Sequence, residues 1–424
     1  MSVFRSIVTA AALATVATPA VAQQEVVWWD FLSGGDGVRM AALIDRFNEE
    51  HPDINIDATT LEWGVPFYTR IRTSTAVGEG PDIMTYHLSR VPLALDEGVL
   101  SEITAEDLAN AGLTTNDFYE RSIAAASSDD GTLHAVPFDV HSVVLYYNRD
   151  MLEGTNYLDA DGNLTGMDSL ESFEAAMAAL VENGVTEPLS YATADAGTTY
   201  RVFYTLFSQM GGELITDGEV LAGDNADKAV RAIEIMARWR ENGWVPEQTE
   251  YPASVALFTS GRSPFHWNGV WEVPTMTDLA ASGELSFDWG AVQIPALMGQ
   301  LGTWADSHAF AIPQEDQPMD PEKRAAVMTV IGWMSQNSLS WAEAGHVPAF
   351  RSVAESDDFR AMEPNATYAA LVETVAYDPR SQIAGVASPL YDAVQNLIVP
   401  AVDGFVTPQQ AIDQMKTDLQ RLIR

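Results

Sequence analysis

The apolar positions near the start of the chain follow a pattern that alternates between strand-like and helical spacing. Strand-like runs cover residues 25–29, 54–58 and 82–86, and helical spacing covers 40–47 and 66–77. Glycine and proline residues separate these segments, as is usual at turns. This order predicts a parallel sheet with helical crossovers, in which a ligand lies beyond the carboxyl ends of the strands.

The same mixture of elements continues to the end of the chain. A β-rich stretch covers 136–148, and helical segments cover 170–183, 199–210, 226–242, 390–394 and 408–422. Apolar residues occur along the whole chain, and its 424 residues exceed the usual size of a domain with a single core. The pattern therefore predicts an α/β protein with two lobes.

The first residues have the features of a secretory signal peptide. Arg5 supplies a positive charge, 7–16 is apolar, and Ala20-Val21-Ala22 is a small-residue cleavage signal. We therefore expect a signal peptide at 1–22 and an exported mature chain. No later apolar run reaches the roughly 18 residues of a membrane span, so a soluble mature protein without direct membrane insertion is expected.

Composition narrows the function further. The chain has no cysteine, which excludes thiol chemistry, a cysteine metal site and a lipid on an N-terminal cysteine. An exported protein without a lipid anchor suits an enclosed periplasm, so we expect the periplasm of a Gram-negative bacterium. The formal net charge of −38 disfavours nucleic acid and anionic lipid as partners, and mildly disfavours strongly anionic substrates.

Five motifs occur in an order that resembles one protein family. They are Trp28-Trp29-Asp30 with Phe47-Asn48-Glu49-Glu50-His51-Pro52, Gly78-Glu79-Gly80-Pro81-Asp82-Ile83, the segment 131–150, the segment 258–271, and Gly345-His346-Val347-Pro348-Ala349. Together they resemble family 1 extracellular solute-binding proteins, whose best-understood members are the maltodextrin-binding proteins. The similarity spans essentially the whole mature chain.

The resemblance implies a type II-like periplasmic-binding-protein fold, with a ligand cleft between two α/β lobes. We place the first lobe at 25–139 and 305–345, and the second at 140–304 and 346–424. It also implies a monomeric, non-catalytic component of a bacterial ABC importer. Such a protein closes on a carbohydrate by a hinge motion and delivers it to the permease, with no cofactor and no metal.

Sugars are bound by aromatic rings against their C–H faces and by planar polar side chains at their hydroxyls. The resemblance places at or near the ligand Trp271 and Tyr391 as stacking rings, Asn268, Arg90, Arg201, and His141 in the position of a glutamate. The alternatives are a core position for Trp271, an ordinary Asn-Gly turn at Asn268, and a surface position for Arg90.

Further candidates come from the positions of polar and aromatic residues in the predicted elements. Asp30 and His87 lie at strand ends, Trp63 lies in a Gly/Pro loop, Asp139 shares a strand face with His141, and Trp304, Asp306 and His308 alternate along one strand. Asp36 has the position of a helix N-cap. Asp139 and His141 also fit a purely structural role at a hinge.

Three other functions remain open from the sequence. A metalloenzyme would need His87, His141 and His308 to converge with Asp139 or Asp306, but no close histidine pair supports it. A secreted glycosidase or lyase would share the signal peptide and the many carboxylates. The third is a polyol, phosphodiester or amino-acid binder of the same fold. An acidic ligand becomes the better prediction if Arg90, Arg201 and Arg351 share one cleft.

Overall fold

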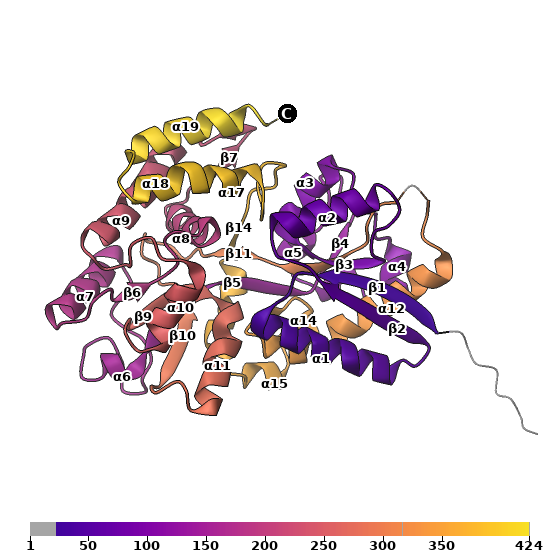
Figure 1. Cartoon of the computed structure of the whole chain (residues 1–424), viewed down its shortest axis with the longest axis horizontal. Helices are drawn as coiled ribbons and strands as arrows, with labels where there is room; N and C mark the ends of the chain where they lie inside the picture. Colours follow the sequence, from indigo (N-terminus) through magenta and orange to yellow (C-terminus); the bar gives the residue numbers. More distant parts are fainter. Residues whose placement is uncertain (1–22, 316, 424) are drawn as a thin grey trace, which may run out of the picture.

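The computed structural model describes residues 23–315 and 317–423, and it shows two α/β lobes lying side by side (Figure 1). The predicted signal peptide at 1–22 lies outside the described residues. Each lobe has its own β-sheet with helices on its faces. The predicted α/β fold with two lobes is confirmed.

The first lobe is built on a five-stranded sheet in the order β2-β1-β3-β12-β4. Its strands are β1 (Gln24–Asp30), β2 (Ile54–Thr60), β3 (Ile83–His87), β4 (Ala135–Pro137) and β12 (His308–Ala311). Its helices are α1 (Gly34–Glu50), α2 (Val65–Thr75), α3 (Val91–Asp96), α4 (Ala105–Asn110), α5 (Glu120–Ala125), α12 (Pro321–Gln336) and α13 (Ser338–Ala342). Strand β1 runs parallel to β2 and β3, as predicted, and β12 is antiparallel to β3 and β4.

The second lobe is built on the sheet β14-β11-β5-β9-β6, with β10 and β13 also paired to β5. Its strands are β5 (Asp139–Asn148), β6 (Leu189–Ser190), β9 (Phe265–Gly269), β10 (Trp289–Gln293), β11 (Trp304–Asp306), β13 (Val347–Pro348) and β14 (Ala376–Tyr377), and a separate hairpin joins β7 (Ile215–Thr216) to β8 (Glu219–Val220).

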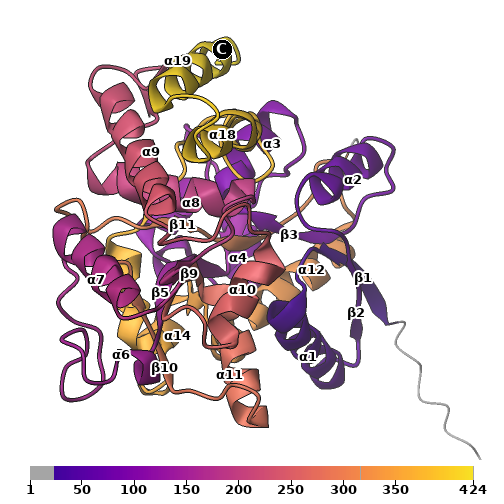
Figure 2. The ribbon, with the colours of Figure 1, turned by 60° about the vertical axis from the view of Figure 1, so that its left-hand side comes forward.

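Most of the helices pack around this second sheet (Figure 2). They are α6 (Arg149–Leu152), α7 (Leu170–Glu182), α8 (Ala196–Gln209), α9 (Asn225–Glu241), α10 (Tyr251–Thr259), α11 (Val273–Ser282), α14 (Arg351–Ala354), α15 (Asp357–Arg360), α16 (Asn365–Tyr368), α17 (Pro389–Ala393), α18 (Val399–Val402) and α19 (Pro408–Gln420). Helix α8 is buried along most of its length, because it lies between the sheet and α9. It therefore offers a rigid base for side chains that face the other lobe.

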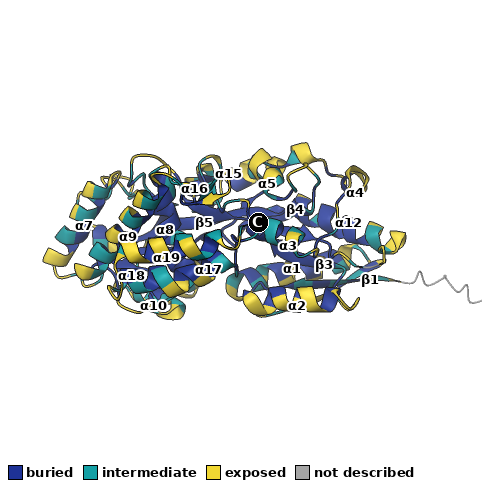
Figure 3. Ribbon diagram, turned by 90° about the horizontal axis from the view of Figure 1, so that it is seen from above, coloured by how far each residue is buried: buried dark blue, intermediate teal, exposed yellow. Residues whose placement is uncertain are grey.

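Local patterns explain why the elements form where they do. In α1, the residues Met40, Leu43, Ile44 and Phe47 share one helical face, and all four are buried. The helix is capped at His51, directly before Pro52, which cannot continue it. Figure 3 shows the result over the whole molecule, with buried strands in the middle and exposed faces on the outer helices.

The chain passes between the two sheets three times, and the first two of these crossings lie next to each other, whereas the third leads from α13 to β13. The first crossing leads from β4 into β5 through Phe138, and the second leads from β11 into β12 through Ser307. These two crossings run antiparallel, and Asp306 lies opposite His141 in the register. A hinge between the lobes would therefore run through these residues. Within 23–315 and 317–423, no helix has the length and apolar content that spanning a bilayer requires.

Candidate ligand-binding site between the lobes

A cavity of about 440 Å³ lies between the two lobes, which is within the usual range for small-ligand pockets. The first-lobe wall consists of residues 31–36, Trp63, His87 and His308, and the second-lobe wall consists of His141, Asp195, Arg201, Tyr251, Trp271, Glu272 and Thr275. Residues 31–36, Trp63 and Trp271 come shortly after β1, β2 and β9, and His87 is the last residue of β3. The cavity thus lies beyond strand ends, where the parallel sheet predicts a ligand.

Trp63 is the more exposed of the two tryptophans on the cavity wall. Its side chain lies in the loop between β2 and α2, and the residue is 42% exposed. The ring meets His87 edge-on, with 6.3 Å between centroids. An exposed indole on a cavity wall offers an apolar face to a ligand.

Trp271, on the opposite wall, is partly buried and held by three neighbours. Its Nε1 donates to the hydroxyl of Tyr251 at 2.8 Å, and the guanidinium carbon of Arg201 lies 4.6 Å from the ring centroid. A Cβ atom on Gly269 would lie 2.2 Å from the ring atoms, so only glycine permits this packing. The close approach of the Trp271 ring therefore explains why the Asn-Gly-Val-Trp motif has a glycine at this position.

Arg201 extends from α8 into the cavity between two indole rings. Its guanidinium carbon lies 4.6 Å from the centroid of Trp271 and 4.7 Å from that of Trp304. Its Nε is buried without a hydrogen-bond partner. Because Arg201 lines the cavity, its guanidinium can donate hydrogen bonds to an acceptor on a ligand.

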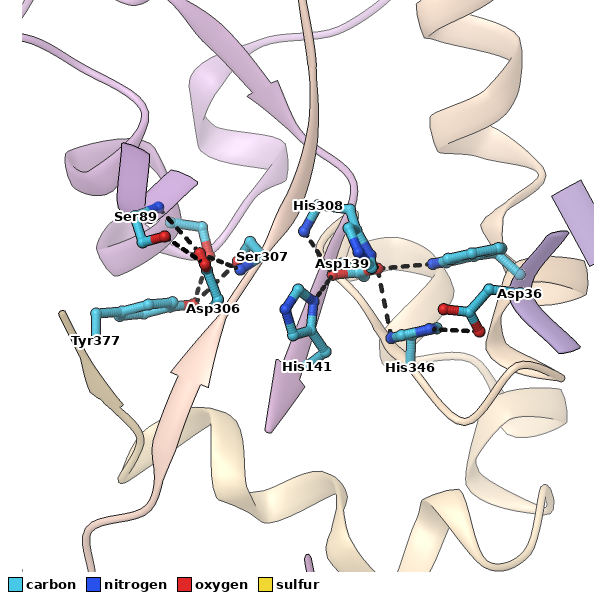
Figure 4. Close-up of polar contacts among 11 residues, drawn as sticks. Asp36, Ser89, Asp139, His141, Asp306, Ser307, His308, His346 and Tyr377 are labelled. Carbon is cyan, nitrogen blue, oxygen red and sulfur yellow. Dashed lines mark hydrogen bonds and ion pairs between the residues drawn. The ribbon is translucent and has the colours of Figure 1, made fainter. Parts of the chain in front are cut away.

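Asp139, which does not line the cavity, is the centre of a buried polar network behind its wall (Figure 4). Its Oδ1 accepts from His141 Nδ1 at 3.0 Å and from the backbone N–H of His308 at 2.9 Å. Its Oδ2 accepts from His308 Nδ1 at 2.7 Å and from Trp341 Nε1 at 2.8 Å. Burial alone would raise the pKa of Asp139, but the neighbouring imidazoles outweigh burial and hold the pKa well below its ordinary value.

His346 links this network to the first lobe. Its Nε2 lies 3.1 Å from Asp36 Oδ1, and its Nδ1 lies 3.5 Å from Asp139 Oδ2. Burial alone would lower the pKa of His346, but the two carboxylates outweigh burial and raise it. The ring also stacks on Trp341, with 4.7 Å between centroids. His346 is thus well placed to carry a charge that balances the carboxylates.

Two imidazoles on the cavity wall are instead held in the neutral form. Burial lowers the pKa of His141 to about 3, and repulsion from His308 adds to this effect. Burial likewise lowers the pKa of His87 well below its ordinary value. The Nδ1 of His87 lies 2.5 Å from the hydroxyl of Tyr68, and its ring stacks on Phe31. A neutral imidazole can bond a hydroxyl group without the desolvation cost of an ion.

Asp306, in the second crossing, lies behind the cavity wall. Its carboxylate accepts from the backbone N–H of Ser89 at 3.0 Å, from Ser89 Oγ at 2.5 Å and from the backbone N–H of Ser307 at 2.8 Å. Burial raises the pKa of Asp306 to about 6, although these hydrogen bonds oppose the shift.

Other predicted site residues are also absent from the cavity wall. Arg90 is 4% exposed and donates to the carbonyls of Val386 and Ala387, so the surface position considered for it is excluded. Trp304 is fully buried, and its ring packs against the guanidinium of Arg201. Tyr391 is buried against Tyr200 in the second lobe.

Asp30 and Asn268 support the wall without lining it. Asp30 accepts from the backbone N–H of Leu32 at 2.9 Å, which shapes the loop after β1. Asn268 accepts from the backbone N–H of Gly269 at 2.7 Å, and its Nδ2 lies 3.0 Å from His266. Both residues therefore hold neighbouring wall segments in place.

The cavity wall also contains residues that the sequence patterns did not single out as ligand-binding. They are Phe31, Asp195, Tyr251, Glu272 and Thr275. Asp36, expected as an N-cap, lies on the wall as well, and the N-cap of α1 is Ser33. The position of Glu272 directly after Trp271 was one available signal. Asp195 could have been noticed as the residue that caps α8.

Two buried groups bring potential metal ligands together among the described residues. One group is Asp139 with His141, His308 and His346, and the other is His87 with His141 and Asp306; ligand atoms in each group lie within 4.8 Å of one another. In the first group, however, the Nδ1 atoms of His141 and His308 already bond Asp139. That geometry is a hydrogen-bond network, with Asp139 as its acceptor.

A family model described as Bacterial extracellular solute-binding protein matches residues 42–367. The chain belongs to the bacterial extracellular solute-binding proteins. The family resemblance predicted from the motifs is thereby confirmed.

Curated relatives of this solute-binding protein include binders of different solutes. A maltooligosaccharide ABC transporter solute-binding lipoprotein of Streptococcus pneumoniae (strain ATCC BAA-255 / R6) is 22% identical over 82% of this chain and 77% of its own length. A galactooligosaccharide-binding protein of Bacillus subtilis is 20% identical over 92% of this chain and 87% of its own. An sn-glycerol-3-phosphate-binding periplasmic protein of Brucella abortus is 25% identical over 40% of this chain and 39% of its own.

Solved structures confirm the fold of the solute-binding protein. Maltose-bound MalE3 of T. maritima has a TM-score of 0.79 at 17% identity and covers 94% of this chain and 99% of its own. The GacH receptor of Streptomyces glaucescens, described both unliganded and with acarbose, has a TM-score of 0.78 at 16% identity and covers 95% and 98%. The predicted type II-like periplasmic-binding-protein fold is thus confirmed.

Proposed function

We propose that this solute-binding protein captures a carbohydrate in the interlobe cavity and delivers it to the permease of an ABC importer. The observation that carries the proposal is the composition of the wall, where Trp63 and Trp271 supply apolar faces from opposite lobes. Neutral imidazoles, carboxylates and the guanidinium of Arg201 surround these rings. Stacking faces combined with planar polar groups match the two sides of a sugar ring.

Capture would proceed by lobe closure about the crossings at Phe138 and Ser307. We propose the lobe boundaries 25–139 with 305–345, and 140–304 with 346–424. The cavity wall draws residues from both sheets, so neither lobe alone supplies the full set of contacts. A ligand that contacts both lobes binds the closed form better, and this difference in affinity drives closure.

The proposal has no chemical step, so the sugar leaves the cavity unchanged. Relatives that are named as solute-binding components support this view. We further propose that the protein works as a monomer in the periplasm of a Gram-negative bacterium, after removal of residues 1–22. The wholly cysteine-free chain has no N-terminal cysteine to carry a lipid.

A thermal-shift screen of the mature chain against neutral mono- and oligosaccharides tests the proposal. A sugar at a hundredfold excess over its Kd should stabilise the folded protein by about 2.7 kcal/mol. Small-angle scattering should show a smaller radius of gyration with that sugar, and chromatography should recover the sugar intact. Recovery of a cleaved or oxidised product would establish an enzyme and refute the transport function.

A matched pair of variants locates the binding. Trp63→Ala removes an indole from the cavity wall, whereas Trp333→Phe alters an indole on α12 that packs on Phe47 away from the cavity. Only Trp63→Ala should weaken the stabilisation by sugar. Equal sensitivity of the two variants would place the ligand elsewhere.

A further inference from the structure

We propose that Asp139 fixes His141 and His308 with their protons on Nδ1, so that their Nε2 atoms accept hydrogen bonds from ligand hydroxyls. The site then selects a neutral polyhydroxylated ligand, or one with an ammonium group, over the same scaffold carrying a carboxylate or phosphate. This inference rests on the proposed carbohydrate function and adds the charge class of the ligand. Asp139 acts as a positioning residue, because it lies behind the wall.

The first step follows from the chemistry of a carboxylate. An ionised carboxylate can only accept hydrogen bonds, so every polar neighbour of Asp139 must donate. His141 Nδ1 and His308 Nδ1 lie 3.0 Å and 2.7 Å from its oxygens. Backbone and indole N–H groups donate to the same two oxygens. Each imidazole must therefore carry its proton on Nδ1.

The second step concerns the remaining nitrogen of each ring. A neutral imidazole with a proton on Nδ1 has a lone pair on Nε2. Both rings line the cavity, and no protein group within 23–315 or 317–423 bonds the Nε2 of either ring. The ring centroids lie 4.3 Å apart, so charging both rings would bring two cations together. When both rings are neutral, they present two adjacent acceptors to a ligand.

The other side chains of the cavity wall also favour a neutral ligand over an anionic one. Asp36, Asp195 and Glu272 contribute three carboxyl groups and Arg201 a single guanidinium, while His346 balances Asp36 and burial raises the pKa of Glu272. Arg201 can donate to hydroxyl oxygens, while the acceptors need ligand donors. A sugar hydroxyl can act as donor and acceptor, so it suits both kinds of group. A carboxylate or phosphate on the ligand would instead face lone pairs and negative charge.

This chemistry separates the candidate ligands suggested by relatives. Neutral oligosaccharides and sn-glycerol 3-phosphate both occur in the names of related proteins. An anionic ligand would be favoured if several arginines shared the cavity. Instead, Arg90 is buried on backbone carbonyls, and Arg351 pairs with Glu355 on the surface. The cavity therefore fits the neutral class.

Nitrogen-15 NMR of histidine-labelled mature protein tests the tautomers directly, without any ligand. The wild-type spectrum should show His141 and His308 protonated on Nδ1 and bare on Nε2, with assignments from His141→Gln and His308→Gln. Asp139→Asn should change this pattern, because an amide can also donate. The control Trp341→Phe removes a different donor from Asp139 and should leave the tautomers unchanged. A wild-type ring protonated on Nε2 would overturn the proposal.

Calorimetry on the wild-type protein tests the selectivity. The probes are glucose, maltose, glucosamine, glucuronate, glucose 6-phosphate and sn-glycerol 3-phosphate, each in a chelator-containing buffer. Glucuronate and glucose 6-phosphate should bind at least about a hundredfold more weakly than glucose, because like charges in a desolvated site repel. Asp139→Asn should weaken the binding of the tightest-binding neutral ligand at least about tenfold. It should also reduce the difference in affinity between glucose and the two anionic sugars.

The outcomes separate this inference from the function on which it rests. Tighter binding of an acid than of its neutral parent would refute the acceptor arrangement and leave carbohydrate binding intact. Sugar binding that requires added Zn²⁺ would also refute it, since the metal would occupy the Nε2 atoms. If no saccharide binds, the proposed function fails, and the NMR spectrum still decides the tautomers.

Discussion

The first two crossings each bury a carboxylate in the same hinge region, yet the surroundings shift the pKa values of these carboxylates in opposite directions. Asp139 and Asp306 are both fully inaccessible to solvent. The imidazoles around Asp139 outweigh its burial and lower its pKa well below the ordinary value, whereas burial raises the pKa of Asp306 to about 6. Burial is therefore not what distinguishes the two sites.

The difference lies in the kind of donor that each carboxylate meets. Asp139 faces imidazoles and an indole, and the imidazoles can carry positive charge. Asp306 accepts its hydrogen bonds from neutral backbone and hydroxyl donors of Ser89 and Ser307, although ring nitrogens of His87 and His141 lie within 4.8 Å. Neutral donors offset part of the free-energy cost of burying a carboxylate, and donors that can carry a positive charge offset more of it. Asp139 in the first crossing therefore stays ionised near neutral pH, whereas Asp306 in the second crossing titrates at mildly acidic pH.

Removing the fixed anion should have the largest effect. Asp139→Ala leaves several buried donors without an acceptor, so we expect the free energy of unfolding to fall by about 3–5 kcal/mol. Asp306→Ala leaves three neutral donors and removes a carboxylate that is costly to ionise, so its loss should be about 1–3 kcal/mol. Urea unfolding at pH 7 measures both. Equal losses would contradict the contrast between the crossings.

Of the two tryptophans near the crossings, Trp271 should affect ligand binding and Trp304 should affect stability. Trp271 lies on the cavity wall beside His141, so Trp271→Ala should weaken sugar binding by about 2–4 kcal/mol, as truncating an aromatic anchor does. Trp304, in the second crossing, is fully buried, so Trp304→Phe should chiefly affect stability. Calorimetry on folded variants distinguishes them. An unchanged affinity in Trp271→Ala would remove Trp271 from the ligand site.

The pH dependence of stability should also differ between the two carboxylates. Between pH 3.8 and about 6, folded Asp306 keeps a proton that the unfolded chain releases, so its contribution to stability falls as pH rises. Asp306→Asn removes the titrating carboxyl and with it this loss of stability. The free energy of unfolding of the variant, relative to wild type, should therefore rise by up to about 3 kcal/mol from pH 4 to 7.

Asp139→Asn is the matched control for that experiment. The lowered pKa of Asp139 gives stability that is present above its unfolded value of 3.8 and lost as pH falls further. Because Asp139 also helps to raise the pKa of His346, the comparison is made in a His346→Gln background, where the difference in the free energy of unfolding should stay flat from pH 4.5 to 7. A rise like that of Asp306→Asn would show that both carboxylates titrate alike.

The smallest effect should come from an exposed contact between the lobes. Arg39 on α1 pairs with Asp278 on α11, with 3.0 Å between Arg39 Nη2 and Asp278 Oδ1, and the Asp278 side chain is 63% exposed. Solvent screens such a pair, so Arg39→Gln should change the ligand affinity by only about 0.2–1 kcal/mol. The change should disappear at high salt. A change in ligand affinity as large as that expected for Trp271→Ala would mean that lobe closure depends on the Arg39–Asp278 pair.

Local patterns were sufficient to predict the first five elements of the first lobe. Strands β1, β2 and β3 and helices α1 and α2 follow from alternation, helical spacing and Gly/Pro breaks, because these preferences act between residues close in sequence. The motif after β9 pointed to Trp271, and the Gly/Pro loop pointed to Trp63, which both line the cavity. Loops that follow strand ends can be recognised in this way.

The arrangement of the histidines near Asp139 depended on the tertiary structure. His87, His141, His308 and His346 are far apart in sequence, and only the antiparallel crossings and β13 bring them around Asp139. Sequence position likewise could not show that Arg90 bonds backbone carbonyls beyond residue 380 while Arg201 lies free between two indoles. The physical reason is that local preferences determine periodicity and turns, whereas the protonation and partners of a buried group depend on which distant segments pack against it.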